Sequence, residues 1–387
     1  MVSRTTALGI IAIVTIAIIV AVVAYAIYGS TQAKEYTKTI PTTIVKTRTT
    51  TITKTLTKEI PITKTMTSII TTTRLKPMTI KVVVDALGNR LEFTSPPKRV
   101  VSLAPSITEE LCSLGLCDKL VGVDQFSNYP EEVIEAVKKG RIVIVGGYWN
   151  PDVEKIVKLK PDLVLADAGV PNHAIIAKKL REEGIKVLFL LSSRSRSIDD
   201  IASDIMRIAT VFGVEDKAMK LLDEIRTRIH AVSAELVSHN VTKPKTLVVF
   251  GSPKWGIYAA GGGTFIDYVI RVAGGVNVAA KYYGWPMLSS EDIVSMNPSV
   301  VIIAHASGKP KTILSAWMNT SLAETTAFKT GRVCVVTGPA NDALLRPGPR
   351  IADSVEIVAS ILHPELFKVP ASYKSYVYCM SGGSAGG

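Results

Sequence analysis

An acidic residue with aromatic neighbours recurs at two places in the sequence. Glu154 begins the pattern E-x-I-V-x-x-x-P-x-[LV]-V-[LI], and Glu291 begins the same pattern 137 residues later. Aromatic rings precede both copies, namely Tyr148, Trp149, Tyr283 and Trp285. Acidic side chains can pair with basic groups of a partner, whereas aromatic rings bind ligands through apolar contact. The combination indicates binding chemistry that the chain presents twice.

Residues that would support catalysis or hold a metal are not grouped in this sequence. The five histidines are scattered without H-x-x-x-H spacing, and no triad-like grouping stands out. Gly261–Gly263 precedes a predicted helix, but neither a phosphate-loop nor a dinucleotide glycine pattern surrounds it. We therefore predict that the protein is not an enzyme and has no catalytic residue, no metal site and no cofactor.

The repeated pattern predicts the elements that position these residues. Each copy indicates a short helix, a break at proline and a buried parallel strand. A second pair of segments supports the duplication, because Val100–Leu103 and Leu247–Phe250 are apolar runs that each enter a small-residue turn. We interpret the chain as two similar α/β lobes with a cleft between them, where small ligands usually bind.

The first lobe is expected to be a doubly wound parallel sheet, since apolar runs alternate with helical segments. After an edge hairpin over 79–93, the predicted strands are 99–103, 120–123, 142–145, 163–166 and 187–191. Ser106 starts a capping-box pattern, so a helix is expected to begin there, with Ser106 either facing a ligand or only closing the helix. Asn150 is expected to cap the helix of the first repeat, with Pro151 in its first turn.

A bridge and a second lobe follow. Apolar residues recur at helical spacing from Ser197 to His239, with an interruption at Gly213, and we interpret this stretch as a stiff helix that lets the lobes rock only slightly. The second lobe repeats the plan, with strands at 245–250, 256–260, 300–304 and 332–336 and helices at 264–273, 290–296, 311–317, 322–328 and 350–362.

The fold class is therefore α/β, with two similar doubly wound lobes joined by a long bridging helix and preceded by a transmembrane helix. Residues 7–28 carry no charge and are long enough to cross a bilayer. We favour an uncleaved anchor over a signal peptide, because the run exceeds the usual signal core. The expected divisions are a membrane segment (1–30), a Thr-rich stalk (31–77), the lobes (78–196 and 244–366), the bridge (197–243) and a flexible tail (367–387).

The net charge of +12 does not indicate a nucleic-acid partner. Nine basic and two acidic residues lie within 31–78, and with Arg4 they leave an excess of only four for the folded part. An unclustered excess of that size makes no phosphate-binding stripe. In the Thr-rich segment apolar and Thr residues partly alternate, as in strands, but its monotony favours an extended stalk outside the cell.

Extracellular chemistry is also suggested by the cysteines and by two glycosylation sequons. Cys112 and Cys117 are close enough in sequence for a local disulfide, while Cys334 and Cys379 either pair or stay free. Asn240-Val-Thr and Asn319-Thr-Ser are the sequons, each a weak signal alone.

Residues 79–365 resemble the substrate-binding component of ABC importers of the iron-chelate and vitamin B12 class. The resemblance rests on R-V-V-S-L-A-P-S-I-T-E at 99–109, L-V-G-V-D at 120–124 followed by Tyr-Pro, V-G-G before the first repeat, A-G-G-V-N at 273–277, and Trp-Pro before the second repeat. It implies two α/β lobes joined by a long helix, in agreement with the patterns above, and binding without catalysis.

The resemblance also implies a bulky, partly apolar metal chelate as ligand: a corrinoid, a ferric siderophore or haem. Such ligands need aromatic walls with a few polar anchors. The implied ligand-binding residues are Pro105, Ser106, Phe126, Tyr129, Tyr148, Trp149, Trp255, Trp285, Asp342 and Arg346. Tyr148 stands where similar B12 binders carry Trp, and the rings of Phe126 and Tyr129 either roof the cleft or pack under it.

Cobalamin or a related corrinoid is our preferred ligand, with a ferric siderophore or haem as the alternative. The run from Asp124 to Pro130 is closer to the B12-binding branch. An anionic siderophore would need several converging arginines, and only Arg346 and Arg350 are obviously placed for that.

Glu154 and Glu291 match the two glutamates that, in this family, dock the lobes onto arginines of a permease dimer with its ATPase subunits. The alternative is that each acid only complements a helix dipole. The implied location is the cell surface, outside the cytoplasm and anchored to its membrane. Two other classes remain as alternatives: a tetrapyrrole or metal-cluster enzyme of chelatase-like architecture, and a structural surface protein on a stalk.

Overall fold

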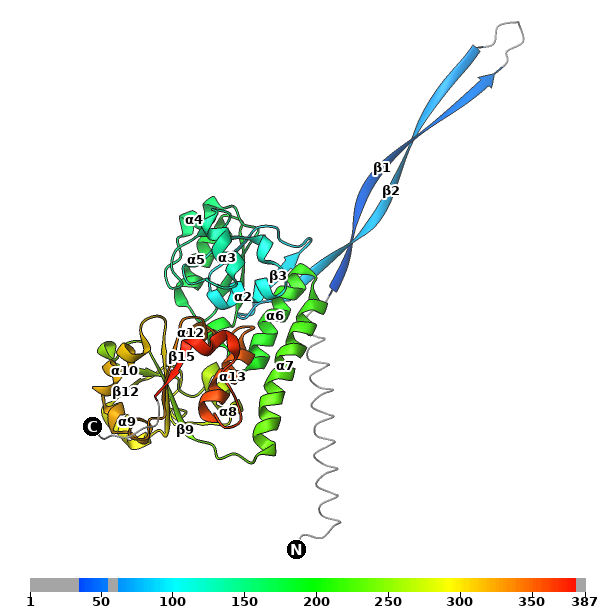
Figure 1. Cartoon of the computed structure of the whole chain (residues 1–387). Helices are drawn as coiled ribbons and strands as arrows, with labels where there is room; N and C mark the ends of the chain where they lie inside the picture. The colour runs from blue at the N-terminus through cyan, green and yellow to red at the C-terminus, as the bar shows by residue number, and fades with distance from the viewer. Residues whose placement is uncertain (1–34, 55–61, 381–387) are drawn as a thin grey trace, which may run out of the picture. The chain divides into compact units, whose positions relative to one another are not determined.

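In the computed structural model of the chain, residues 35–54 and 62–380 are described, and side chains are described from Ile80 onward (Figure 1). The predicted membrane segment, residues 7–28, lies outside the described residues. Among those described, no helix is both long enough and apolar enough to cross a membrane.

Two long strands form the Thr-rich region. β1 (Glu35–Lys54) and β2 (Ile62–Val84) pair antiparallel from end to end, with Glu35 opposite Lys81 and Lys54 opposite Ile62. β3 (Arg90–Phe93) pairs with β2, which confirms the predicted edge hairpin. The single extended stalk predicted for 31–77 is therefore wrong in form. Thr and apolar residues alternate along it, and β-branched side chains of this kind favour paired strands.

The first lobe is built on a parallel sheet of five strands in the order β6-β5-β4-β7-β8. The strands are β4 (Val100–Ser102), β5 (Leu120–Val123), β6 (Val143–Ile144), β7 (Leu163–Asp167) and β8 (Lys186–Leu190). The helices are α2 (Pro105–Ser113), α3 (Glu131–Lys138), α4 (Val153–Lys158) and α5 (Pro171–Glu182). Every residue of β7 is buried, as expected for a strand covered on both faces. The doubly wound lobe predicted from the alternating pattern is confirmed.

Two predicted helix caps in this lobe are wrong. α2 begins at Pro105, with Ala104 as its N-cap, because a proline without an N–H group fits the first helical position. Ser106 therefore lies inside the first turn. α4 is capped by Asp152, whose side chain accepts a hydrogen bond from the backbone N–H of Lys155 at 3.0 Å, and not by Asn150.

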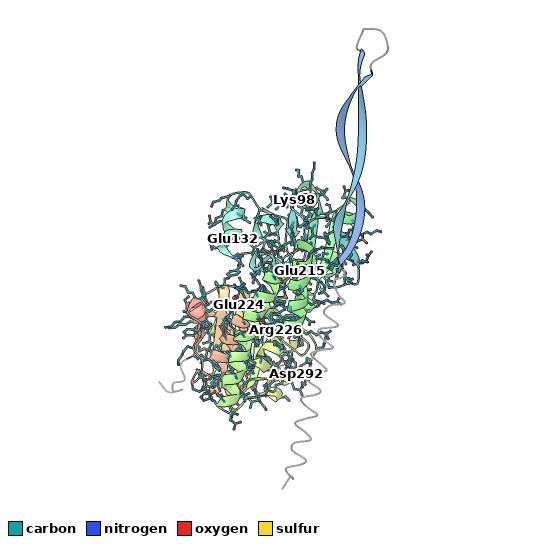
Figure 2. The ribbon with its side chains drawn as sticks, turned by 90° about the vertical axis from the view of Figure 1, so that its right-hand side faces the viewer. Lys98, Glu132, Glu215, Glu224, Arg226 and Asp292 are labelled. Carbon is teal, nitrogen blue, oxygen red and sulfur yellow. A yellow bond between two sulfur atoms is a disulfide. The ribbon has the colours of Figure 1, made fainter. Side chains whose placement is uncertain are left out.

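The predicted bridge consists of two helices, α6 (Ile198–Phe212) and α7 (Glu215–Ser238), which pack against each other. The break is at Gly213, whose φ of 72° lies in the left-handed region that glycine adopts readily. α6 contacts α2 of the first lobe, and α7 contacts helices of the second. Figure 2 looks onto α7, on which Glu224 and Arg226 are labelled.

The second lobe has a mixed sheet in the order β12-β10-β9-β13-β14-β15, with β11 also paired to β9. Its strands are β9 (Lys245–Phe250), β10 (Ile257–Ala259), β11 (Val276–Asn277), β12 (Met287–Leu288), β13 (Val300–His305), β14 (Val333–Thr337) and β15 (Val377–Cys379). β9, β13 and β14 are parallel, but β10, β12 and β15 pair antiparallel. The prediction that the second lobe repeats the parallel plan of the first is thus wrong. The link from β9 to β10 is too short to hold a crossover helix, so these strands pair antiparallel.

The helices of the second lobe are α8 (Phe265–Val272), α9 (Ser290–Met296), α10 (Pro310–Met318), α11 (Thr326–Lys329), α12 (Gly338–Leu345) and α13 (Ile351–Leu362). Short 3-10 turns lie at Cys117–Lys119, Ser192–Arg194, Pro253–Trp255, Ser321–Glu324 and Ala371–Tyr376. The helix predicted at 322–328 is therefore divided into a 3-10 turn and α11. α12 was not predicted.

The described residues contain two disulfides. Cys112 pairs with Cys117, as the sequence suggested, and Cys334 on β14 pairs with Cys379 on β15. The tail predicted to be loose over 367–387 is therefore wrong for its described part, because residues 371–379 form a 3-10 turn and the last strand of the sheet.

Candidate ligand-binding site

The carboxyl ends of the parallel strands in the first lobe carry most of the predicted ligand-binding residues. β4 leads directly into α2, which starts with Pro105 and Ser106, and β5 leads into the loop from Asp124 to Pro130. Ligands of open α/β sheets bind at this edge. Phe126 and Tyr129 are 47% and 43% exposed, so their rings project from the loop and do not pack under it.

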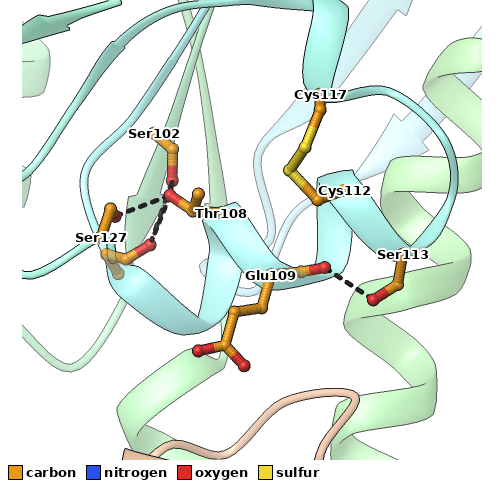
Figure 3. The surroundings of a disulfide bond; sticks show 8 residues. Ser102, Thr108, Glu109, Cys112, Ser113, Cys117 and Ser127 are labelled. Carbon is orange, nitrogen blue, oxygen red and sulfur yellow. Dashed lines mark hydrogen bonds between the residues drawn. A yellow bond between two sulfur atoms is a disulfide. The ribbon is translucent and has the colours of Figure 1, made fainter. Parts of the chain in front are cut away.

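A buried polar cluster fixes that loop. Asp124 accepts hydrogen bonds from the backbone N–H of Phe126 (2.8 Å) and from the hydroxyl of Ser127 (2.5 Å). Thr108 on α2 bonds both Ser127 (2.8 Å) and Ser102 (2.9 Å), as Figure 3 shows. Burial raises the pKa of Asp124. The loop is thereby held against α2.

Tyr148 is held in place by two buried residues that the sequence did not single out. Its hydroxyl donates to Asp167 at the end of β7 (2.6 Å), and its carbonyl accepts a hydrogen bond from Nε2 of His173 (2.7 Å). Nδ1 of His173 accepts from the N–H of Asp167, so Nε2 carries the proton. Burial lowers the pKa of His173, which favours this neutral form, and raises that of Tyr148. The sequence feature that could have indicated Asp167 is its position as a carboxylate at the end of a buried strand.

Trp149 is the ring that this arrangement presents to solvent. Tyr148 lies edge-on to Trp149, with 4.6 Å between ring centroids, and Trp149 is 60% exposed. The Tyr148 hydroxyl is already bonded, so its ring supports Trp149 more than it faces outward.

The second lobe presents its own aromatic group. Trp255, in the 3-10 turn after β9, is 78% exposed, and Trp285 is 40% exposed. Trp285 packs edge-on against Phe250 and Phe265, at 5.3 and 6.3 Å. Tyr283 accepts a hydrogen bond from Arg196 of the first lobe (2.7 Å), a contact that joins the two lobes.

Asp342 and Arg346 lie at a junction between the lobes. Both belong to the α12 region, where the sequence predicted a loop. Arg346 donates to Glu109 (2.9 Å), to the side chain of Asn128 (2.8 Å) and to the carbonyl of Phe126 (3.1 Å). Asp342 forms an ion pair with Arg346 (2.9 Å) and accepts from Asn128 (3.0 Å). Neither side chain is a free anchor for a ligand.

Glu109 on α2 is the centre of this junction. Arg350 donates to both of its carboxylate oxygens, at 2.8 and 2.6 Å, and also stacks over the ring of Tyr129, 4.2 Å from the centroid. Glu109 and Arg350 are 2% and 6% exposed. Figure 3 shows the Glu109 carboxylate pointing away from the Thr108 cluster. We call Glu109, Asp342, Arg346 and Arg350 the Glu109 junction.

The two repeated glutamates occupy equivalent positions. Glu154 is the second residue of α4 and Glu291 the second residue of α9, and both are exposed. Each lies beside a shallow surface hollow, of about 800 Å³ at Glu154 and about 740 Å³ at Glu291. The duplication therefore places one exposed acid in the same setting on each lobe.

The fold and these sites define a two-lobed solute-binding protein. Residues 100–340 match the family model described as periplasmic binding protein, and the chain belongs to this family. Membership agrees with the prediction of binding and not catalysis.

Three known proteins illustrate the likeness. The chain is 32% identical over 298 residues to the uncharacterized ABC transporter substrate-binding lipoprotein YvrC of Bacillus subtilis, covering 76% of this chain and 88% of that one. It is 32% identical over 285 residues to a cobalamin-binding protein of Halobacterium salinarum, covering 72% and 73%. The crystal structure of a periplasmic heme-binding protein from Pseudomonas aeruginosa superposes with a TM-score of 0.63 at 25% identity, over 74% of this chain and 98% of that one.

Proposed function

We propose that this protein is the extracytoplasmic substrate-binding component of an ABC importer and captures a bulky metal chelate between its lobes. Family membership and the name of the B. subtilis relative support the role. The two disulfides are typical of an oxidising compartment outside the cytoplasm. Residues 7–28 would anchor the protein to the membrane.

Cobalamin or another corrinoid is the ligand that the site supports best. The observation that carries this choice is the pairing of exposed rings on both lobes, Phe126 and Trp149 on one and Trp255 and Trp285 on the other, with arginines that are already neutralised. A large, partly apolar chelate gains most from such walls. The H. salinarum relative is named for cobalamin. Haem is the second candidate, because of the P. aeruginosa neighbour.

Tryptophan fluorescence tests the proposal directly. Three of the four tryptophans lie at the candidate site, whereas Trp317 is fully buried in the second lobe. Cyanocobalamin should quench the wild-type protein saturably, with haemin and a ferric siderophore as competitors. The Trp149→Phe/Trp255→Phe/Trp285→Phe variant, which keeps only Trp317, should lose the saturable part. Saturable quenching by haemin alone would replace the corrinoid with haem, and quenching by none of the three would reject the proposal.

Delivery to the permease would use Glu154 and Glu291. A two-fold permease dimer requires matching contacts on each lobe, and the two acids at the starts of α4 and α9 would supply them, because their positions are equivalent.

A further inference from the structure

The Glu109 junction contains the two arginines that would otherwise favour an anionic ligand. Arg346 and Arg350 come from the second lobe, and both point to the carboxylate of Glu109 on the first. Arg346 has Asp342 as a second acidic partner. Two cations are thus matched by two anions, and the junction is neutral as a whole.

Arg346 is close to the ring-bearing loop. It donates to the carbonyl of Phe126 and to the side chain of Asn128, both in the loop that carries the rings of Phe126 and Tyr129. A charge left unpaired at Arg346 or Arg350 would therefore act on a ligand at those rings. Coulomb attraction of this kind is strong where water is largely excluded.

We infer that Glu109 determines ligand specificity by neutralising Arg346 and Arg350, so that the site rejects anionic chelates in favour of uncharged ones. This inference rests on the proposed function, because it assigns the charge class of the chelate that the same site takes. Arg350 stacked on Tyr129 shows how closely the neutralised charge approaches an aromatic wall.

A basic side chain outside the junction also affects the affinity for anionic ligands. Arg196 is exposed and bonds the hydroxyl of Tyr283, so it can attract acidic ligands whether or not Glu109 is present. The effect of Glu109 is for this reason measured as a change between variants of one protein and not as an absolute preference.

The experiment compares two iron chelates of different charge. A ferric tris-catecholate, with a charge of about −3 at neutral pH, and an uncharged ferric tris-hydroxamate are titrated into full-length wild type and Glu109→Gln by fluorescence quenching. Glu109→Gln leaves one cation unpaired, so the tris-catecholate should bind about tenfold more tightly than to wild type, and the tris-hydroxamate with unchanged affinity. The gain should shrink as salt is raised from 50 to 500 mM, because ions screen the added charge.

Glu110→Gln is the matched control. Glu110 is the next residue of α2 and is equally buried, but burial and the nearby acids Asp204, Glu109 and Asp167 raise its pKa well above the usual range. Its amide variant removes a buried carboxyl from the same helix without removing a partner of Arg346 or Arg350, so it should bind both iron chelates like wild type.

A second variant decides the case if Glu109→Gln does not fold. Asp342→Asn removes the more exposed partner of Arg346 and should give a smaller gain for the tris-catecholate, about threefold, with the same salt dependence. Equal affinities for the tris-catecholate in wild type and in every folded junction variant would overturn the inference. Cyanocobalamin is titrated into wild type in parallel. Its binding to wild type tests the proposed function, whereas the difference between wild type and the junction variants tests the inference.

Discussion

The sheet of the first lobe is parallel throughout, whereas the second lobe adds antiparallel strands at both edges of a parallel centre. Both lobes nevertheless place exposed rings after a parallel strand that lies inside the sheet, β5 in one and β9 in the other. Each also carries an exposed glutamate of the repeated pattern, Glu154 or Glu291, as the second residue of a short helix. The exposed rings and the exposed glutamates are therefore repeated between the lobes, whereas the edge strands of the sheets are not. This comparison suggests that the inner parallel strands fix the position of the site.

The largest expected effect concerns the repeated acids. Glu154→Arg together with Glu291→Arg should abolish stimulation of the cognate transporter's ATPase, since each lobe would meet basic permease residues with like charge. Ligand affinity, measured by quenching, should not change. Each single variant should lose part of the stimulation, because the lobes contribute equivalent contacts. Full stimulation by the double variant would assign both acids to their helix dipoles alone.

The two disulfides should differ in their contribution to stability. Cys334–Cys379 links residues 45 apart, and Cys112–Cys117 links residues 5 apart. In the chain-entropy view the longer loop restricts the unfolded chain more. Cys334→Ser/Cys379→Ser should therefore lower the free energy of unfolding by about 4 kcal/mol, and Cys112→Ser/Cys117→Ser by about 2 kcal/mol. Urea denaturation under non-reducing conditions measures both free energies of unfolding. Equal losses would show that loop length does not determine how much each disulfide stabilises the protein.

The buried ion pair that joins the two lobes should contribute more to stability than the exposed ion pair between the bridge and the second lobe. Arg350→Met leaves the buried Glu109 with one cation fewer and should cost about 3 kcal/mol. Arg228 joins α7 to Asp353 and Glu356 of α13, but its side chain is 44% exposed, so Arg228→Met should cost about 1 kcal/mol or less. Thermal and urea unfolding compare the two variants. A larger loss at Arg228 would mean that the junction contributes little to holding the lobes together.

The last prediction is a pH dependence of stability that originates in the first lobe. Glu110 has no hydrogen-bond partner for its carboxylate among the described residues, and Asp204, whose pKa burial raises to about 6, lies close enough to repel it. Because the folded pKa of Glu110 is raised, folded protein holds a proton that unfolded protein loses above about pH 4.5. Wild-type stability should fall relative to Glu110→Gln as pH rises from 4 to 7, because only the unfolded protein gives up the proton over that range. Urea denaturation at the two pH values tests this, and parallel pH profiles would contradict it.

The central strands could be predicted because apolar runs of four to six residues bounded by turns leave few alternatives. β15 could not, since a three-residue strand after a proline-containing tail has no pattern of its own and depends on β14 and the Cys334 bond. Cysteine pairing in general does not follow from sequence. α12 was missed because Gly338-Pro339 resembles a turn.

The sequence left open whether the rings of Phe126 and Tyr129 roof the cleft or pack under it, because a loop pattern does not set the direction of a side chain. Both rings are exposed in the structure, whereas Tyr148 is half-buried. Whether they bind ligand stays a prediction. The part that sequence could not supply is the Glu109 junction. Glu109 fitted a local capping box, whereas its actual partners lie 237 and 241 residues further along the chain. A local pattern cannot reveal a partner at that distance.

The main chain passes from the sheet of the first lobe to that of the second once, by way of α6 and α7. All five strands of one sheet precede this passage and all seven of the other follow it. A single proteolytic cut between residues 239 and 244 would therefore yield two pieces with intact sheets. Their reassociation would measure, without any covalent tether, how strongly the halves of this receptor hold each other.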